Sequence, residues 1–184
     1  MIVGVGGQGS LLASKILGRL LVDEGFDVKV SEVHGMSQRG GSVVTYVRFG
    51  EKVYSPVIAD GEADIIVSFE KLEGARYIKN LKKGGRIIVN SRQIDPMPVI
   101  TGAAEYPEGI LEDLKKAGVQ VDDMDALDLA LQAGSAKAVN LVLMGRLARY
   151  FDISYDKWMK AVESCVNPKL FEMNKKAFDI GYNS

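Results

Sequence analysis

The chain has 184 residues, a length expected of one domain over residues 1–184. Hydrophobic residues make up 47% of it and charged residues 26%, and the formal net charge is −1, so the sequence lacks the basic footprint of a nucleic-acid-binding protein. No apolar run approaches the roughly 20 residues of a membrane helix. We therefore expect a cytoplasmic globular protein that binds neither nucleic acid nor a membrane.

The side chains that carry most enzyme chemistry are scarce: Cys165 is the one cysteine and His34 the one histidine. One thiol excludes an internal disulfide, an iron–sulfur cluster held by this chain alone and a thiolate zinc site, since each needs several thiolates. One imidazole argues against a histidine metal site in the same way. The sequence therefore predicts no metal site and little catalytic equipment.

The N-terminal elements are predicted to be a strand over residues 1–5, a helix over residues 9–24 and a second strand over residues 27–31. Together they would form one βαβ unit with a right-handed crossover. Further along we expect strands over residues 42–49, 63–69, 86–90, 96–101 and 119–121, a hairpin partner for 42–49 over residues 52–55, an acidic turn at residues 122–123, and helices over residues 70–80, 108–117, 126–133, 136–151, 155–165 and 168–178.

Strands that alternate with helices predict an α/β fold with a Rossmann-like, doubly wound, mostly parallel sheet and helices on both of its faces. The valine-rich strand over residues 42–49 and its expected hairpin make that sheet mixed. From Asp125 onward the pattern is helical throughout. We therefore expect a helical C-terminal region outside the sheet.

The turn after the first strand contains Gly4, Gly6 and Gly9, which have the G-x-G-x-x-G spacing. Glycine permits the tight turn and the close approach of backbone, and the open helix N-terminus behind such a turn can hold a phosphate. Glu32 lies 23 residues beyond Gly9, roughly where an acidic residue binds the ribose of a dinucleotide. Spacing alone leaves two interpretations open: a nicotinamide or flavin nucleotide site, or glycines that only build the turn.

A glycine-rich loop over residues 32–41 follows the second strand, at the edge of the sheet where ligands and partners dock in open α/β folds. Arg39 offers a planar fork of donors for a carboxylate or a phosphate, and Met36 is an adaptable apolar contact. His34 is either a proton carrier or a structural hydrogen-bonding group. The loop is therefore a candidate for ligand or partner binding.

Taken together, the stretches GVGGQG and SEVHGMSQRGGSV resemble the gamma-type component of the 2-oxoacid:ferredoxin oxidoreductases. The second stretch most resembles the small, beta-named subunit of the indolepyruvate branch of that family. The resemblance covers nearly the whole chain. Its further matching positions are Ser68, Phe69, Glu70, Asn140, Gly145, Asn167, Pro168 and Asn174.

The resemblance implies an accessory subunit that is inactive alone and binds no complete cofactor. It places thiamine diphosphate, Mg and the 4Fe-4S clusters in a large catalytic partner, which oxidatively decarboxylates indolepyruvate or another aryl 2-oxoacid. Electrons then pass to ferredoxin, and coenzyme A takes the acyl group as cosubstrate. The alternatives are the pyruvate, 2-oxoisovalerate or 2-oxoglutarate branch, a free-standing NAD- or FAD-binding Rossmann oxidoreductase, and a non-enzymatic docking module.

Within this family the glycine turn has two alternative roles: contact with the phosphates of coenzyme A, or packing with Gln8 bonded to the neighbouring loop over residues 32–42. The residues of the turn are Gly4, Gly6, Gly7, Gln8 and Gly9. Arg39 would bind coenzyme A, a substrate carboxylate or an acidic group of the partner. The resemblance also moves Glu32 from a ribose contact to the loop or the partner.

The predicted partner interface consists of Glu32, His34, Met36, Ser37, Gln38, Arg39, Gly40 and Gly41. Two of these residues, Glu32 and His34, are the candidates for a catalytic role. Made without its partner, the chain is expected to form a homodimer.

Overall fold

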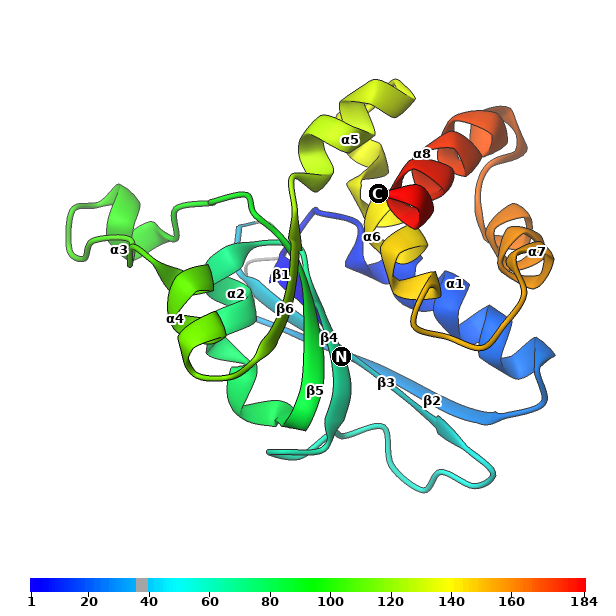
Figure 1. Ribbon diagram of the computed structural model, residues 1–184, viewed down its shortest axis with the longest axis horizontal. Coiled ribbons are helices and arrows are strands. Elements are labelled where there is room, and N and C mark those ends of the chain that lie inside the picture. The colour runs from blue at the N-terminus through cyan, green and yellow to red at the C-terminus, as the bar shows by residue number, and fades with distance from the viewer. Residues whose placement is uncertain (36–39) are drawn as a thin grey trace.

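The computed structural model describes residues 1–35 and 40–184, and within them six strands form one mixed sheet (Figure 1). The strands are β1 (Ile2–Val5), β2 (Asp27–His34), β3 (Ser42–Gly50), β4 (Ala63–Ser68), β5 (Leu81–Asn90) and β6 (Gln120–Met124). Their order is β2-β3-β1-β4-β5-β6; β1, β4, β5 and β6 are parallel, and β3 is antiparallel to both of its neighbours. The predicted α/β fold with a mixed sheet is confirmed.

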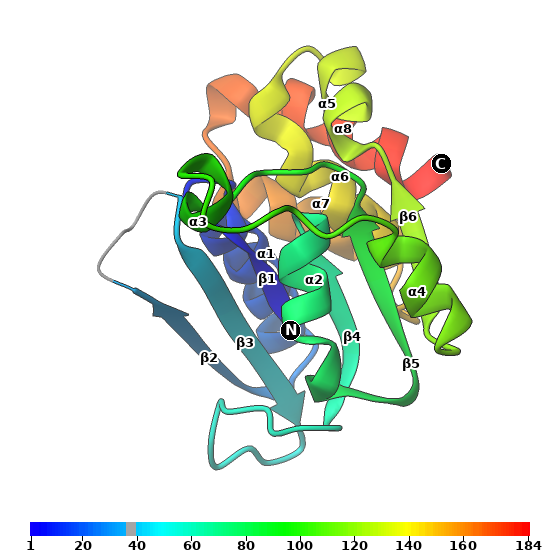
Figure 2. The same cartoon turned by 90° about the vertical axis from the view of Figure 1, so that its left-hand side faces the viewer.

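The helices are α1 (Ser10–Asp23), α2 (Lys71–Arg76), α3 (Met97–Ile100), α4 (Ile110–Lys116), α5 (Ala126–Ala133), α6 (Val139–Ala148), α7 (Tyr155–Cys165) and α8 (Phe171–Asn183), with 3-10 turns at Ile78–Asn80, Ala136–Ala138 and Pro168–Leu170. One face of the sheet is covered by α1 and α6, and α5, α7 and α8 pack outside them as the predicted helical C-terminal region. The opposite face is covered by α2 and α4 (Figure 2). Within residues 1–35 and 40–184, none of the helices has both the length and the apolar character that crossing a membrane requires.

Each strand at the centre of the sheet contributes to two apolar cores, because successive side chains of a strand point to opposite faces. Ile2 and Val67 pack with α1 and the C-terminal helices, whereas Val3 and Ile66 pack on the side of α2 and α4. All four side chains are buried. The end of β1 is therefore held from both faces, which positions the glycine turn that follows it.

The predicted βαβ unit is wrong in one respect, since β2 is not the neighbour of β1. Instead β3 lies between them, with Ser42 opposite Val5 of β1 and Val43 opposite His34 of β2. A short connection such as the one from β2 to β3 favours an antiparallel neighbour, whereas adjacent parallel strands need a long crossover. β1 and β2 still run in the same direction, so both end at the same edge of the sheet.

Two of the predicted strands, over residues 52–55 and 96–101, are not formed. Residues 52–55 form no hairpin with β3, because β1 and β2 already occupy both of its edges, and residues 51–62 are an irregular connection. Residues 96–101 contain the short helix α3, with no buried residue, instead of an edge strand. Pro98 cannot donate to a sheet ladder, and the edge beside β5 is taken by β6.

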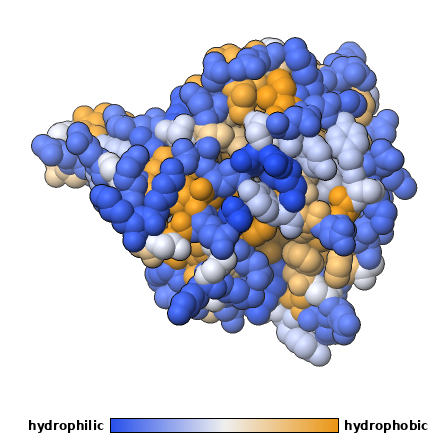
Figure 3. Space-filling model, in the orientation of Figure 1, coloured by the Kyte–Doolittle hydropathy of each residue, from blue (hydrophilic) through white to orange (hydrophobic). Residues whose placement is uncertain are grey.

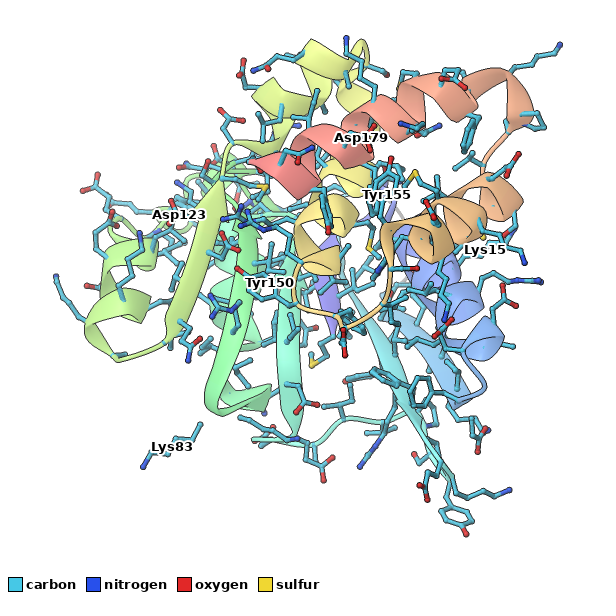
Figure 4. The ribbon with its side chains drawn as sticks, turned by 45° about the vertical axis from the view of Figure 1, so that its right-hand side comes forward. Lys15, Lys83, Asp123, Tyr150, Tyr155 and Asp179 are labelled. Carbon is cyan, nitrogen blue, oxygen red and sulfur yellow. The ribbon has the colours of Figure 1, made fainter. Side chains whose placement is uncertain are left out.

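The predicted acidic turn at residues 122–123 lies inside β6. Asp122 faces α6 and forms a bidentate ion pair with Arg146, at 2.8 Å from Nε to Oδ2 and 2.7 Å from Nη2 to Oδ1. Asp123, labelled in Figure 4, is paired with Lys115 of α4 at 2.8 Å. Because neighbouring side chains of a strand alternate, the two carboxylates point to opposite faces and are used separately to hold helices.

Helices α6 and α8 pack closely against each other. A Cβ atom on Gly145 would lie 2.1 Å from the carbonyl oxygen of Phe178, and one on Gly181 would lie 1.9 Å from the carbonyl oxygen of Val142. Both distances are far below any van der Waals contact, so the two backbones approach in a way that only glycine permits. This contact holds the C-terminal region together.

Candidate functional site

The glycine turn ends β1 and begins α1 at the carboxyl edge of the parallel strands (Figure 1). Gly7 and Gly9 have φ angles of 98° and 91°, a left-handed conformation that other residues rarely adopt. Gly9 is the N-cap of α1, and its carbonyl accepts the first helical hydrogen bond, from the N–H of Ala13 at 3.2 Å. The predicted strand–turn–helix geometry is confirmed at this point.

The side chain of Gln8 folds back into the hollow of the turn. Its Oε1 accepts a hydrogen bond from the N–H of Val5 at 2.6 Å, and its Nε2 donates to the carbonyl of Phe69 at 3.1 Å. A Cβ atom on Gly4 would lie 2.8 Å from both Gln8 Oε1 and Phe69 Cβ, so glycine at this position makes room for the amide. Among the described residues, Gln8 therefore bonds the end of β4. Its predicted bond to the loop before β3 stays a prediction, because residues 36–39 of that loop lie outside the described residues.

The third glycine of the motif makes room for another amide. A Cβ atom on Gly9 would lie 2.8 Å from Nδ2 of Asn140, a buried residue at the start of α6 that donates to the carbonyl of Gly9 at 3.4 Å. Asn90, at the end of β5, donates to the carbonyl of Phe69 at 3.1 Å and accepts from the N–H of Ala126. The ends of β1, β4 and β5 are thus joined by side-chain amides of the chain itself.

The glycine turn is bonded directly to the connection between β2 and β3. The N–H of Gly6 donates to the carbonyl of Gly41 at 2.9 Å, and the N–H of Gly40 donates to the carbonyl of Gly6 at 3.3 Å. These two backbone bonds make one surface of the two motifs that the sequence singled out. Met36, Ser37, Gln38 and Arg39, the central part of the predicted interface, lie outside the described residues.

Glu32 and His34 belong to β2 and not to the loop. Glu32 accepts a hydrogen bond from Thr45 of β3 at 3.3 Å, and β3 separates it from β1. A ribose-binding carboxylate follows the strand next to the first one, and here β3 occupies that place. The imidazole of His34 is exposed, and its Nδ1 lies 2.9 Å from the carbonyl oxygen of Gly35. The geometry gives Glu32 no ribose position.

The buried carboxylate of Glu73 was not among the residues expected at the site. It lies on the face of the sheet that α2 and α4 cover, near the carboxyl edge of the strands. Glu73 of α2 accepts a hydrogen bond from Ser42 of β3 and forms an ion pair with Arg76, with 3.2 Å between Glu73 Oε1 and Arg76 Nε. Burial raises the pKa of Glu73, and the bond from Ser42 and the charge of Arg76 oppose this effect. A Glu-x-x-Glu pattern directly after a buried strand, at Glu70 and Glu73, is the signal that could have identified it.

Glu70, the first residue of that pattern, is the N-cap of α2. Its Oε2 accepts from the N–H of Glu73 at 2.9 Å, and its Oε1 accepts from the N–H of Ile94 at 3.2 Å and from the hydroxyl of Tyr106. Burial and the bond to Glu70 raise the pKa of Tyr106. With its oxygens occupied by donors, Glu70 is a structural anchor.

Among the described residues, no group of three or more His, Cys, Asp or Glu is placed to hold a metal ion. A cavity of about 580 Å³ lies instead at the opposite, amino-terminal edge of the strands, where Asp64, Lys82 and Phe151 are among its lining residues. The described part of the carboxyl edge consists of the bonded backbone of the glycine turn and of side-chain amides.

The chain matches the model of the family described as pyruvate ferredoxin/flavodoxin oxidoreductase over residues 1–184. It is 44% identical to the indolepyruvate oxidoreductase subunit IorB of Thermococcus kodakarensis over 188 aligned positions, which cover 98% of this chain and 92% of that one. It is 26% identical to the common gamma subunit of the pyruvate/ketoisovalerate oxidoreductases of the same organism, with the same coverage of 98% and 92%.

The fold is also found among solved structures. The pyruvate oxidoreductase subunit PORC of Thermotoga maritima superimposes with a TM-score of 0.74, at 22% identity, over 100% of this chain and 93% of that one. At this identity the likeness shows a shared fold. The match of the family model along the whole chain and the 44% identity to IorB show that the chain belongs to the pyruvate ferredoxin/flavodoxin oxidoreductase family, as a relative of its small, gamma-type subunits.

Proposed function

We propose that the chain is the small accessory subunit of a thiamine-diphosphate-dependent 2-oxoacid:ferredoxin oxidoreductase that acts on indolepyruvate or other aryl 2-oxoacids. The observation that carries the choice of substrate is the difference in identity between two relatives from one organism. The indolepyruvate subunit is 44% identical and the pyruvate/ketoisovalerate subunit 26%, over equal coverage. A pyruvate, 2-oxoisovalerate or 2-oxoglutarate substrate is the alternative within the family.

The large subunit is proposed to hold thiamine diphosphate, Mg and the 4Fe-4S clusters, which supply decarboxylation and electron transfer to ferredoxin when bound. This chain binds none of them completely. Its own contribution is a rigid surface at the carboxyl edge of the sheet, formed by the glycine turn and by the connection from β2 to β3. The two backbone bonds of Gly6 to Gly40 and Gly41 support this role, because they fix the two segments to each other.

The glycine turn is proposed to be a packing element and not a nucleotide or coenzyme A site. Gln8 supports this, because its amide bonds both Val5 and Phe69 inside the turn. The partner interface is proposed to include Glu32, His34, Gly40 and Gly41 together with Met36, Ser37, Gln38 and Arg39. A coenzyme A contact at Arg39 is the alternative role of that residue.

The chain is further proposed to act as one domain over residues 1–184, since the family model spans this range. The cytoplasmic location and the homodimer of the isolated chain stay predictions. Size-exclusion chromatography with light scattering on the purified chain tests the homodimer directly.

Reconstitution tests the proposed function. The large subunit alone, this chain alone and a mixture of the two are assayed for the reduction of a viologen dye with indolepyruvate, pyruvate or 2-oxoglutarate in the presence of coenzyme A. We expect activity only in the mixture, and the highest kcat/KM with indolepyruvate. Full activity of the large subunit alone would contradict an essential accessory role, and a preference for pyruvate would contradict the choice of substrate.

The free-standing nucleotide-binding oxidoreductase is the second candidate, because the glycine spacing favours it. Calorimetric titration of the isolated chain with NAD, FAD and coenzyme A separates it from the proposed function. We expect no micromolar binding of NAD or FAD. Micromolar NAD binding that is lost in Glu32→Ala would establish the second candidate instead.

A further inference from the structure

We propose that residues 93–109, named here the α3 arm, dock into the large subunit, and that the receiving surface is an apolar pocket bordered by lysine or arginine side chains. The inference rests on the proposed function, which supplies the partner chain. The arm follows the end of β5, passes through α3 and returns to α4, and it projects from the body of the molecule (Figure 1).

The tip of the arm is apolar and exposed. The sequence of α3 is Met-Pro-Val-Ile, and none of its residues is buried. Met97 is 63% exposed and Ile100 is 65% exposed, and Figure 3 shows apolar atoms among hydrophilic ones where this arm projects. A helix whose residues are all apolar gains nothing from exposure to water, and it becomes buried when a protein partner covers it. Methionine in particular adapts to the shape of a partner surface.

The rim of the arm is acidic. Residues 93–109 include Asp95, Glu105 and Glu108 but no lysine or arginine, and Glu112 follows in the first turn of α4. Among the described residues, none of these four carboxylates forms an ion pair. Unpaired charge of one sign on the segment that carries an apolar tip favours a partner of the opposite sign. The same charge repels the acidic arm of a second copy.

The base of the arm is held firmly by one buried carboxylate. Glu70 accepts from the N–H of Ile94 where the arm leaves the sheet and from the hydroxyl of Tyr106 where it returns. Tyr106 in turn accepts from the N–H of Leu72 at 3.2 Å. The tip is also bonded internally, with the N–H of Ala103 donating to the carbonyl of Pro98 at 2.8 Å. An arm fixed before it binds loses less conformational entropy on binding.

The arm lies at the same edge of the sheet as the proposed partner interface. β1 and β5 run in the same direction, and β2 runs with them. The glycine turn, the connection from β2 to β3 and the arm therefore all follow the carboxyl ends of strands. One surface of the partner can therefore contact the glycine turn, the connection from β2 to β3 and the arm, and the arm projects farthest toward it.

Binding measurements with the purified large subunit test the arm. The dissociation constant is measured for the wild-type chain, for the double variant Met97→Asp/Ile100→Asp, and for the control Tyr54→Asp. Tyr54 is 89% exposed on the irregular 51–62 connection, so the control adds one charge to a surface away from the arm. We expect the double variant to bind at least about 30-fold more weakly, because it removes the apolar anchor of the contact, and the control to bind as the wild type does.

The thermal unfolding midpoint of the double variant should equal that of the wild type, because neither side chain is buried. Equal affinity of the double variant and the wild type would overturn the inference. A wild-type chain that does not bind the large subunit at all would overturn the proposed function instead. Wild-type self-association that the double variant abolishes would show that the arm binds a second copy, and would also overturn the inference.

The charge of the receiving surface is tested separately with Glu105→Lys/Glu108→Lys. If that surface is basic, the wild-type affinity falls as salt is raised, and the charge-reversed variant binds about 10-fold more weakly at low salt with a flatter salt dependence. The same salt dependence in both proteins would contradict a basic border around the pocket.

Discussion

The α6–α8 contact and the carboxyl edge of the sheet both depend on glycine, but for different reasons. In the helix pair, Gly145 and Gly181 remove side chains so that two backbones touch in an apolar interior. At the carboxyl edge, Gly4 and Gly9 remove side chains so that the amides of Gln8 and Asn140 reach the backbone of the turn. The helix pair is held together by packing, whereas the carboxyl edge is held together by hydrogen bonds between side-chain amides and the backbone.

The two kinds of surface on this molecule, buried and exposed, should contribute to different properties: the buried one to stability and the exposed one to association. The C-terminal helices bury large side chains, including Trp158 and Phe178, whereas the arm beside the carboxyl edge buries none in α3. Substitutions in the helix pair should therefore act on folding, and substitutions at the exposed arm should act on binding alone. The glycine turn and Glu73 lie between these extremes, because they are polar and partly or largely buried.

The largest effect is expected for Gly145→Ala. The new Cβ atom would meet the carbonyl oxygen of Phe178 at 2.1 Å, and a backbone atom cannot rotate away as a side chain can. We expect the free energy of unfolding to fall by about 3 kcal/mol or more, measured by urea unfolding. Gly18→Ala is the matched control, since a Cβ atom there would meet only Val30 Cγ2 at an ordinary 3.6 Å. An equal response of both variants would contradict close backbone packing as the cause.

The second effect is expected for Asp122→Asn, which breaks the bidentate pair with Arg146. Burial opposes ionisation of Asp122, but hydrogen bonds from Arg146 and Tyr150 hold its pKa below the usual value. We expect a loss of about 2 kcal/mol at neutral pH, between the values for exposed and fully buried pairs. Because the folded pKa is the lower one, this contribution is present above the unfolded pKa of about 3.9 and disappears as the pH falls.

The control for that variant is Asp64→Asn, which removes an exposed pair with Lys82 and should change stability by less than about 0.5 kcal/mol. Urea unfolding at several pH values measures both. If the cost of Asp122→Asn did not shrink toward acid pH, the ion pair would not be its source.

A smaller effect is expected for Gln8→Ala, which leaves the N–H of Val5 without its acceptor. We expect a loss of about 1–2 kcal/mol, because the freed donor is partly buried. Gln132→Ala removes an exposed amide bonded to Asp128 and serves as the control. Unchanged stability of Gln8→Ala with a raised KM for coenzyme A in the reconstituted enzyme would assign the turn to the cosubstrate instead.

The smallest effect is a dependence on pH at Glu73. Burial raises its folded pKa above the unfolded value of about 4.3, so the folded state binds the proton more tightly. The contribution of Glu73 to stability is therefore complete at low pH and is lost as the pH rises through the folded pKa. The stability of the wild type relative to Glu73→Gln should decline in urea unfolding as the pH rises above the unfolded value of about 4.3. A difference that rises with pH would show that the pair with Arg76 dominates.

Local sequence patterns predicted those helices and turns whose conformation depends only on neighbouring residues. The helices over residues 126–133 and 155–165 have the bounds that periodicity predicted, and the glycine turn between β1 and α1 has the expected geometry. The two motifs of the candidate site were also found from sequence, because glycine spacing is visible without a fold. What these motifs contact was not visible in the same way.

The sequence by itself determined the alternation of strands and helices, the glycine turn and the scarcity of catalytic side chains, because each depends on residues close together or on composition. Only the tertiary structure decided that β3 separates β1 from β2, that Asp122 and Asp123 hold different helices, and that Gln8 bonds Phe69. These outcomes join residues up to 61 positions apart. Contacts between residues so far apart depend on which helices and strands pack side by side. The conformational preferences of short segments do not predict them.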